Sequence, residues 1–491
     1  MKRIHHFRLG GSIDMLTGPL LKKLLLFSLP LMASSVLQLL FNAADVVVVG
    51  RYASYASLAA VGSTTAIVNL VVNLLIGMAV GVNVVVARYI GEGDKSREIS
   101  AAIHTAVAMA LVGGLILGGA GCGKSTLIRA IVNMVGAGHS MVLCAPTGKA
   151  ARNLEKRTGL SARTVHSALG MHPDEDFLAP VTWNTTQLVV VDEASMMTLE
   201  MLAGILHRVP KICRVVLLGD PNQLLSVGSG NVLPDLLALG VPCARLELNH
   251  RQDDEAEALL HNVVDFKKLH SKPDLAFDQS FCLHEMGTAE IKEAVTEEAV
   301  RRFAQGESVQ VLSPYNNKGN LSAYALNMAI RDRVNPLERG KIVLKRGKDS
   351  FRDNDRVIIL QNDRERNCSN GDVGILHILK VEGKRVTYCV ELPDGRCPTW
   401  DDASGLAQLS LAYCLTVHKS QGSEYDTILL PIAKGMDGML SRNLLYTAIS
   451  RAKKRVILYG DPQALDVAVQ KNLPQRKSLL VPKTRMLLEC A

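Results

Sequence analysis

Residues 111–130, "LVGGLILGGAGCGKSTLIRA", constrain this chain more than any other stretch of its sequence. Residues 118–125 fit the phosphate-binding pattern G-x-x-x-x-G-K-[ST], in which glycines let the backbone curl and point its N–H groups at phosphate oxygens. Lys124 is expected to reach the β- and γ-phosphates and Ser125 to hold Mg²⁺, with a helix from Thr126 adding its N-terminal dipole. The loop needs a strand directly before it, so the apolar residues 113–117 are predicted to be the first strand of a parallel sheet. The predicted nucleotide-binding residues are Gly118, Gly119, Ala120, Gly121, Cys122, Gly123, Lys124, Ser125 and Thr126.

A pair of adjacent carboxylates follows a second apolar run, "QLVVVDEASMM", at residues 187–197. Its four apolar residues predict a buried parallel strand, and the ligand sites of open α/β sheets lie beyond the carboxyl ends of such strands. Asp192 is predicted to bind Mg²⁺ through water, and Glu193 to orient the attacking water as general base. Such a pair can instead cap a helix, but the phosphate-binding loop upstream favours the metal site.

The overall composition fits several domains and an anionic partner. The chain has 491 residues, enough for about three domains, and a net charge of +8. Its ten cysteines are scattered, with no C-x-x-C pair and no histidine cluster at metal spacing. The sequence therefore predicts neither a disulfide nor a zinc framework, and it favours a reducing cytosol.

The first hundred residues have the character of a membrane segment. No charged side chain occurs in residues 24–44 or 52–87, and each run exceeds the roughly 20 residues needed to cross a bilayer. A cleaved signal peptide fits poorly because both runs are too long, and two buried helices of a soluble core are the other alternative. We therefore predict two to three helices in the cytoplasmic membrane, with the lipid bilayer as a partner. Lysines and arginines before the first run and after the second place both flanks in the cytoplasm.

Residues 15–112 resemble the N-terminus of the MATE (multidrug and toxin extrusion) transporters. "LTGPLLKKLLLFSLPLMASSVLQLLFNAADVVVVGRYAS" is similar to their first helix, and "LAAVGSTTAIVNLVVNLLIGMAVGVNVVVARYIGEGD" to their second. Asp45 matches an acidic position of that first helix, although it can equally be a helix-end residue. The resemblance implies about twelve helices for transport, and this chain offers two and part of a third. We expect no transport by this polypeptide alone, and residues 101–112 are predicted to form a helix that does not cross the bilayer.

Several further motifs follow the phosphate-binding loop in a fixed order. They are "APTGKAARNL" (145–154), "TVHSALG" (164–170), "LLGDPNQLLSVGSGN" (217–231), "LNHRQ" (248–252), "LTVHKSQGSEYD" (415–426) and "LLYTAISRAKKRVILYG" (444–460). Together they resemble the motor of a superfamily 1 DNA helicase of the RecD-like branch, over about residues 115–470. A kinase or GTPase would instead show substrate-recognition or base-recognition loops.

The resemblance implies two RecA-like α/β domains with ATP and Mg²⁺ in the cleft between them. It implies that Gln223 senses the γ-phosphate, and that Arg251 and Arg451 reach across the cleft to it. Fixed cations suit this place because charge builds on the transferred phosphoryl group. Each arginine could otherwise be a surface residue of a helix. The predicted catalytic residues are Lys124, Asp192, Glu193, Gln223, Arg251 and Arg451.

The other motifs are predicted to contact single-stranded DNA and duplex junctions. Hydroxyl, amide and lysine groups suit phosphate oxygens, which supply affinity without reading sequence. Few aromatic residues are present, so base stacking is limited to rings such as Tyr315. A single histidine is more often a packed core residue, which is the alternative for both histidines in the set. The predicted DNA-binding residues are Thr147, Lys149, His166, His418, Lys419 and Ser420.

The expected fold class is α/β, with two RecA-like P-loop domains preceded by the membrane segment. Its parts are residues 1–112 (transporter-like helices), 113–246 (first motor domain), 247–470 (second motor domain) and 471–491 (a basic, loosely ordered tail). Short alternating strands with "SNGD" and "PDGR" turns predict a small SH3-like β-barrel inserted at about 338–407.

The sequence departs from the RecD-like pattern before the phosphate-binding loop. The family carries there a helix and a glutamine that reads adenine, and transporter-like sequence takes their place in this chain. The adenine contact is therefore in doubt, and we expect a loose choice of nucleotide. Two functions remain: an ATP-driven DNA helicase or translocase, moving 5′ to 3′ by resemblance and tethered to a membrane, or a MATE-type antiporter fragment, non-functional or regulatory, fused to an incidental ATPase. The intact set of motor motifs favours the first.

Overall fold

The computed structural model describes residues 113–119, 121–135, 140–171, 183–210, 213–226, 228–246, 251–252, 255–267, 272–347, 349–363, 365–382, 385–436, 438–472, 476 and 478–489. The two apolar runs, and the helix expected over residues 101–112, lie outside this part of the chain. Within it, no helix is both long enough and apolar enough to span a bilayer.

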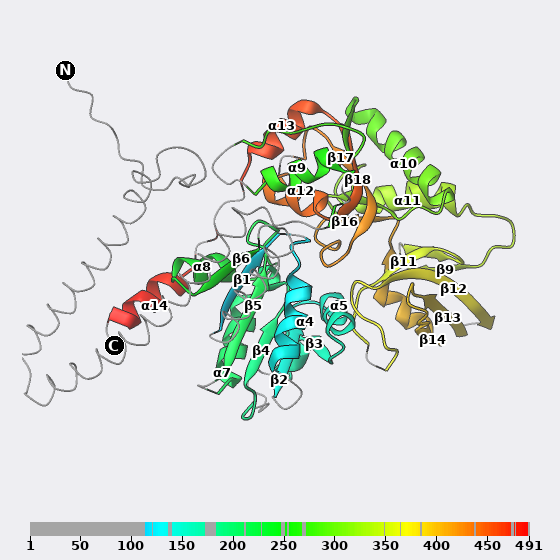
Figure 1. Cartoon of the computed structure of the whole chain (residues 1–491). Coiled ribbons are helices and arrows are strands. Elements are labelled where there is room, and N and C mark those ends of the chain that lie inside the picture. The colour runs from blue at the N-terminus through cyan, green and yellow to red at the C-terminus, as the bar shows by residue number, and fades with distance from the viewer. Residues whose placement is uncertain are drawn as a thin grey trace, which may run out of the picture. The chain divides into compact units, whose positions relative to one another are not determined.

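A six-stranded parallel sheet begins directly before the phosphate-binding loop (Figure 1). Its strand order is β3-β2-β4-β5-β1-β6. The strands are β1 (Gly114–Gly118), β2 (Met141–Ala145), β3 (Ala162–Thr164), β4 (Leu188–Val191), β5 (Arg214–Gly219) and β6 (Cys243–Leu246). The intervening helices are α4 (Lys124–Val135), α5 (Gly148–Thr158), α6 (Val165–Ala168), η1 (Ala194–Met196), α7 (Leu199–Arg208) and α8 (Val232–Ala238).

The strand predicted before the phosphate-binding loop is confirmed, one residue later than expected. β1 pairs in parallel with β5 on one side and β6 on the other, so it is an interior strand of the sheet. All four residues of β4 are buried, which explains their unbroken apolar sequence, since a parallel strand is covered on both faces. The helix expected from Thr126 begins two residues earlier, at Lys124.

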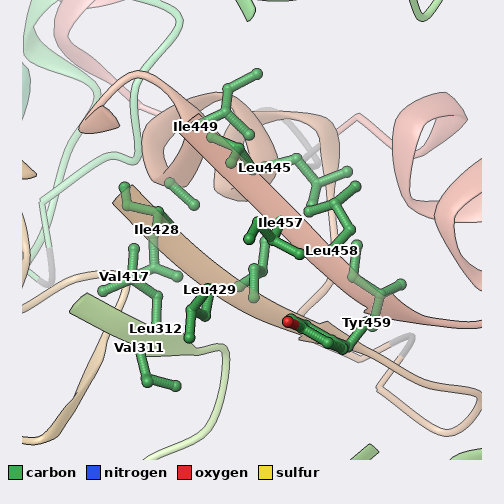
Figure 2. Close-up of a cluster of buried hydrophobic side chains, with 14 of the residues drawn as sticks. Val311, Leu312, Val417, Ile428, Leu429, Leu445, Ile449, Ile457, Leu458 and Tyr459 are labelled. Atoms are coloured by element: carbon green, nitrogen blue, oxygen red, sulfur yellow. The ribbon is translucent and has the colours of Figure 1, made fainter. Parts of the chain in front are cut away.

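A second parallel sheet of five strands has the order β16-β8-β17-β18-β7. Its strands are β7 (Phe281–Glu285), β8 (Val309–Ser313), β16 (Cys414–Thr416), β17 (Tyr425–Ile432) and β18 (Ala452–Gly460). Its helices are α9 (Glu257–Asp265), α10 (Thr288–Ala304), α11 (Ala323–Val334), α12 (Arg442–Ile449) and α13 (Pro462–Gln470). Figure 2 shows part of its core, where Leu312, Leu429 and Leu458 come from three neighbouring strands and Leu445 from α12.

The predicted insertion is present between α11 and β16 and consists of antiparallel strands. They are β9 (Val343–Arg346), β10 (Asp349–Arg352), β11 (Arg356–Ile359), β12 (Val373–Glu382), β13 (Arg385–Glu391), β14 (Thr399–Trp400) and β15 (Leu409–Leu411). A short 3-10 helix, η2 (Ala403–Gln408), lies between β14 and β15. Five of them form a sheet in the order β14-β13-β12-β11-β15, and β9 pairs with β10. No ladder among the described residues joins β14 to β15, so the expected closed barrel is not confirmed.

The tail is more ordered than the sequence analysis expected. Residues Leu480–Glu489 form a helix, α14. Leu480 packs against the core of the first sheet, and the Arg485 guanidinium donates to the carbonyl oxygen of Ala238, at the end of α8, at 3.0 Å. The guanidinium of Arg476 donates to the carbonyl oxygens of Ser226 and Gly228, both at 2.6 Å. The prediction of a loose tail was wrong because it weighed the basic residues and overlooked the leucines among them.

Candidate nucleotide and nucleic-acid site

The phosphate-binding loop joins β1 to α4 and has the backbone shape that its glycines predict. Gly121 and Gly123 have φ values of 78° and 75°, where a residue with a side chain would be strained. The Lys124 ammonium donates to the carbonyl oxygens of Gly118 and Gly119, both at 2.7 Å. The loop therefore brings a lysine and the first N–H groups of a twelve-residue helix together, as an anion site requires.

The remaining predicted residues of this loop are only partly described. Ala120 and the side chain of Ser125 lie outside the described part of the chain. The Mg²⁺ contact predicted for Ser125 therefore stays a prediction. Cys122 is buried beneath the loop, and Thr126 is exposed on the first turn of α4.

Asp192 and Glu193 lie at the carboxyl end of β4, as the sequence predicts. The Asp192 carboxylate accepts a hydrogen bond of 2.8 Å from the Glu193 N–H. Burial, and then the negative charge of Glu193, raise the pKa of Asp192 to about 6, while the positive charge of Lys124 opposes the rise. Lys124 and the two carboxylates therefore belong to one site.

Glu193 carries two unusual features at once. Its φ of 52° is uncommon for a residue other than glycine. Its Oε2 atom is buried and has no hydrogen-bond partner among the described residues. Backbone strain and an unsatisfied carboxylate oxygen cluster at functional sites, where a ligand or water completes the hydrogen bonding.

The loop that follows β5 is joined to α12, beside the second sheet, by buried hydrogen bonds. The Tyr446 hydroxyl donates to Asp220 Oδ2 at 2.6 Å. The Leu224 N–H donates to Thr447 Oγ1 at 2.9 Å. These bonds hold the loop on both sides of Gln223 against α12, which follows more than two hundred residues later in the chain.

Gln223 and Arg451, which the sequence analysis assigned to opposite sides of the cleft, are in direct contact. Arg451 Nη2 donates to Gln223 Oε1 at 2.8 Å, and both residues are buried. The hydrogen bond that the structure records for this guanidinium ends on a neutral amide, and its Nε has no partner among the described residues. A buried arginine with this surplus of donors is suited to an anionic ligand.

Arg251 lies close to Arg451 and to the two carboxylates. Its guanidinium donates to the Ser450 carbonyl oxygen at 2.8 Å and to Glu424 Oε1 at 2.9 Å. Burial lowers the pKa of Arg251, and the positive charge of Arg451 lowers it further, while Glu424 and Glu193 oppose the change. Two neighbouring guanidinium groups repel each other. An anion between them would reduce this repulsion.

Two residues near the phosphate-binding loop escaped the sequence analysis. Lys267 and Tyr446 both lie against the backbone of Gly119. A Cβ atom at this glycine would collide with Lys267 Nζ and would lie 2.9 Å from the Tyr446 hydroxyl. Lys267 Nζ also lies 3.9 Å from Cys122 Sγ. Lys267 follows α9 in a segment that looks like an ordinary charged helix end, so no sequence signal marks it. The fold supplies a second lysine to this loop.

Helix α5 carries the first of the residues predicted to bind DNA. Thr147 is its N-cap, and its side-chain oxygen accepts a hydrogen bond from the Ala150 N–H at 3.2 Å. Lys149 Nζ donates to Ser423 Oγ at 2.6 Å, which brings two of the sequence motifs together. Burial lowers the pKa of Lys149 to about 8, opposed by the negative charge of Asp372. The lysine is therefore half protonated near pH 8 and largely protonated at neutral pH.

The structure separates the other predicted DNA-binding residues. His166 is exposed on α6, Lys419 is exposed, and His418 is half-buried. Burial lowers the pKa values of His418 and Lys419. Ser420 is fully buried and donates its hydroxyl to the Val417 carbonyl oxygen at 2.8 Å. This hydroxyl is therefore bonded within the local turn, and the predicted DNA contact of Ser420 stays a prediction.

The residues present fit a magnesium-nucleotide complex. Cations surround the phosphate side through Lys124, Lys267 and Arg451. On the metal side stand two carboxylates. Burial and the negative charge of Glu193 raise the pKa of Asp192, and the Oε2 of Glu193 has no hydrogen-bond partner among the described residues. Carboxylate oxygens and bound water are the ligands that Mg²⁺ prefers.

Comparisons with known protein families divide the chain in the same way as the sequence motifs. Residues 97–270 match the AAA domain family, and residues 411–459 match the UvrD-like helicase C-terminal domain. Residues 30–120 match the MatE family. The first and third matches overlap at residues 97–120, and within that overlap Gly114–Gly118 form β1 of the first sheet.

Two bacterial proteins are among the relatives of this chain. The chain is 35% identical over 378 residues to the ATP-dependent RecD2 DNA helicase of Deinococcus radiodurans, covering 76% of this chain and 50% of that protein. It is 28% identical over 430 residues to the RecBCD enzyme subunit RecD of Mycolicibacterium smegmatis, covering 79% of this chain and 74% of that one. The chain thus spans half the length of the first of these relatives.

A solved structure of Bacteroides Pif1 bound to single-stranded DNA is also similar, at 17% identity and a TM-score of 0.48, covering 79% of this chain and 96% of that one. A likeness of this size carries no weight for function.

Proposed function

We propose that residues 113–470 are the motor of an ATP-dependent superfamily 1 DNA helicase of the RecD type. The observation that carries the proposal is the direct hydrogen bond between Gln223 and Arg451, beside Lys124 and the Asp192–Glu193 pair. It unites residues from both sheets at one buried anion site. An arginine that reaches the nucleotide from the second part of the chain would couple that part to phosphoryl transfer.

The roles of the individual residues follow from their positions. Lys124 and the loop amides bind the β- and γ-phosphates, with Lys267 as a second cation. Glu193 orients the attacking water and accepts its proton, since its Oε2 has no other partner. Arg451 and Arg251 stabilise the charge that develops on the transferred phosphoryl group.

Mg²⁺ would be held by Asp192, through water, and by Ser125, and would neutralise charge on the phosphate oxygens. The adenine is left without an assigned contact, so the site accepts other nucleoside triphosphates as well as ATP.

Single-stranded DNA is the proposed partner of α5 and of the segment 415–426, which Lys149 and Ser423 already join. The N-terminus of α5, Thr147 and Lys149 suit phosphate oxygens, and Lys419 and His418 extend the same path. Tyr315 is half-buried, with Lys318 Nζ 5.7 Å from its ring centroid, and it offers one stacking surface. Such a set follows the backbone and reads little sequence.

The domain division that we propose is 113–246 for the first motor domain, 247–470 for the second and about 338–407 for an SH3-like insertion, with residues 471–491 as a basic tail that includes α14.

The match to MatE supports a chain of two origins. We propose that its two apolar runs attach the motor to the cytoplasmic membrane, with the motor on the cytoplasmic side, where ATP is present. Fractionation of cells expressing the full chain tests this, and recovery of the chain in the soluble fraction alone would contradict attachment.

Unwinding assays test the proposed activity. The full-length chain should displace a strand from duplexes with a 5′ single-stranded tail when ATP and Mg²⁺ are present. The Lys124→Ala variant should bind DNA but neither bind nucleotide nor unwind. Displacement from 3′-tailed duplexes alone would contradict the RecD-type assignment, and efficient unwinding by Lys124→Ala would contradict the assigned nucleotide site.

A further inference from the structure

Two cysteines of the inserted sheet lie within reach of each other, far along the chain from the nucleotide site. Cys397 Sγ is 2.9 Å from Cys389 Sγ, and both thiols are free. Cys389 is buried in β13, whereas Cys397 is exposed in the turn before β14. Among the described cysteines, Cys243 and Cys397 are the exposed ones.

The hairpin between β13 and β14 explains why the thiols meet. Cys389 lies directly opposite Thr399, so Cys397 is its diagonal neighbour on the same face of the hairpin. The turn is closed by hydrogen bonds from the Leu392 N–H to the Arg396 carbonyl oxygen at 2.8 Å and from the Val390 N–H to the Pro398 carbonyl oxygen at 3.0 Å. A disulfide bond is about 2.05 Å long, so the sulfur atoms need to approach by roughly 0.9 Å.

We propose that Cys389 and Cys397 form a reversible disulfide, and that this bond fixes the hairpin turn which holds helix α5. The oxidant is a peroxide. The Cys397 thiolate attacks one peroxide oxygen, forming a sulfenic acid and releasing hydroxide, which takes up a proton to become water. The Cys389 sulfur then displaces the sulfenic oxygen, which leaves as a second water with the proton of the Cys389 thiol. Two thiols are thereby oxidised, and one peroxide is reduced.

The order of attack follows from exposure and burial. Cys397 is open to solvent, so peroxide reaches it first. Burial, and then the hydrogen bond with Cys397, raise the pKa of Cys389 to about 12, so Cys389 stays a thiol until the neighbouring sulfur is activated. The exposed sulfur of Cys397 is accessible to a small attacking thiol, which makes this bond reversible by ordinary thiols.

The turn that the disulfide would close is one of the parts of the insertion that contact α5. Asp394 accepts from Lys156 Nζ of α5 at 2.8 Å. Arg396 binds both carboxylate oxygens of Asp394, each at 2.9 Å, and lies 3.2 Å from Asp372 Oδ2. The same Asp372 oxygen accepts from Arg152 of α5 at 2.7 Å.

This ion-pair network joins the insertion to α5, which belongs to the proposed DNA path. Helix α5 begins at Gly148, next to Thr147 and Lys149, and its ion pairs with the insertion end on Asp372 and Asp394. A disulfide restricts the backbone of the turn that presents Asp394 and Arg396. Oxidation should therefore hold α5 against the insertion more tightly than the reduced turn does.

Thiol mapping of the full-length chain tests the bond. Mild treatment with hydrogen peroxide should remove two alkylatable thiols and give a peptide pair, containing Cys389 and Cys397, that is lighter by two hydrogens. Dithiothreitol should reverse both changes. The Cys397→Ser variant should form no such bond, while Cys243→Ser, which removes the other exposed thiol, should behave like the wild type.

Hydrogen exchange tests the consequence for α5. Peroxide should slow exchange in residues 148–158 of the wild type and of Cys243→Ser, and leave Cys397→Ser unchanged. Recovery of Cys389 as a free thiol after peroxide treatment, with Cys397 oxidised alone or linked to another chain, would overturn the proposed bond. An intact bond with unchanged exchange in α5 would overturn the proposed consequence.

Discussion

At the residue scale, the site brings buried charges of both signs together. Asp192 is a buried carboxylate with its pKa raised to about 6. Arg451 is a buried cation beside Arg251, which forms an ion pair with Glu424. A magnesium-nucleotide complex would supply a cation to Asp192 and an anion to Arg451. The site residues are therefore arranged for a ligand that carries both charges.

The raised pKa of Asp192 predicts a pH-dependent need for magnesium. Below about pH 6 this carboxyl group is protonated and loses the charge that would attract Mg²⁺, and above that pH the charge is present. The Mg²⁺ concentration that gives half-maximal ATP hydrolysis should therefore rise severalfold between about pH 7.5 and pH 5.5. Titrations of activity with Mg²⁺ at several pH values measure it. An unchanged Mg²⁺ requirement over this range would contradict the assigned metal ligand.

The lowered pKa of Lys149 predicts a second pH effect, on DNA. The ammonium group of Lys149 loses its proton as the pH rises through about 8, so its attraction for phosphate should weaken there. Affinity for single-stranded DNA should fall between about pH 7 and pH 9 in the wild type. Lys149→Arg is the matched control, because arginine keeps its charge over this range. Fluorescence anisotropy measures both, and equal pH profiles for the two proteins would contradict the role of Lys149.

The arginines should affect turnover far more than DNA binding. Arg451→Ala removes a fixed cation from the phosphoryl group, and such losses cost about 10²–10³ in rate. Its affinity for single-stranded DNA should stay within about twofold of the wild type, because the Arg451 side chain is buried beside Gln223 and is not accessible to a DNA strand. Steady-state hydrolysis and anisotropy separate the two effects. A variant with normal turnover and weak DNA binding would reverse the assignment.

At the element scale, the sequence predicted those strands whose apolar runs lead directly into a motif. β1 and β4 were found in this way, because a parallel strand covered on both faces has a continuous apolar sequence. Elements with mixed composition were predicted less well. Helix α14 was taken for a loose tail, and the small β-barrel predicted for the insertion is not confirmed. Lys267 and Tyr446 could not be assigned to the phosphate-binding loop at all, since only the fold brings residues so distant in sequence together.

The interior strands of the second sheet should govern its stability. Leu429 is fully buried at the centre of β17, between β8 and β18. Leu429→Ala leaves a cavity there and should lower the free energy of unfolding by about 2–5 kcal/mol. Thermal denaturation of the full-length chain measures the loss, with the exposed Leu379→Ala on β12 as the control. A change as small as that of the control would place Leu429 outside the core.

At the scale of the whole molecule, two parallel sheets share one buried site. The contacts of Arg451 with Gln223 and of Tyr446 with Asp220 join residues that belong to different sheets. Binding and release of a nucleotide at this junction would change how the two sheets are held together, which is the step a translocating motor needs. The DNA path through α5 and the segment 415–426 crosses the same junction.

The proposed DNA path relies on phosphate contacts and should be sensitive to salt. For about four contacted phosphates, a fourfold rise in salt concentration should weaken binding of single-stranded DNA about 50-fold. Binding should depend little on base sequence. Affinities measured over a series of salt concentrations test this, and a flat response would contradict a path made of backbone contacts.

The rate of ATP hydrolysis by the full-length chain, with and without single-stranded DNA, tests the central claim most directly. The wild type should hydrolyse ATP with Mg²⁺, and single-stranded DNA should raise the rate severalfold. Glu193→Gln should bind ATP as tightly as the wild type and lose hydrolysis by at least about 10². A wild-type rate that DNA leaves unchanged, or full turnover in Glu193→Gln, would contradict a DNA-driven motor with its nucleotide site between the two sheets.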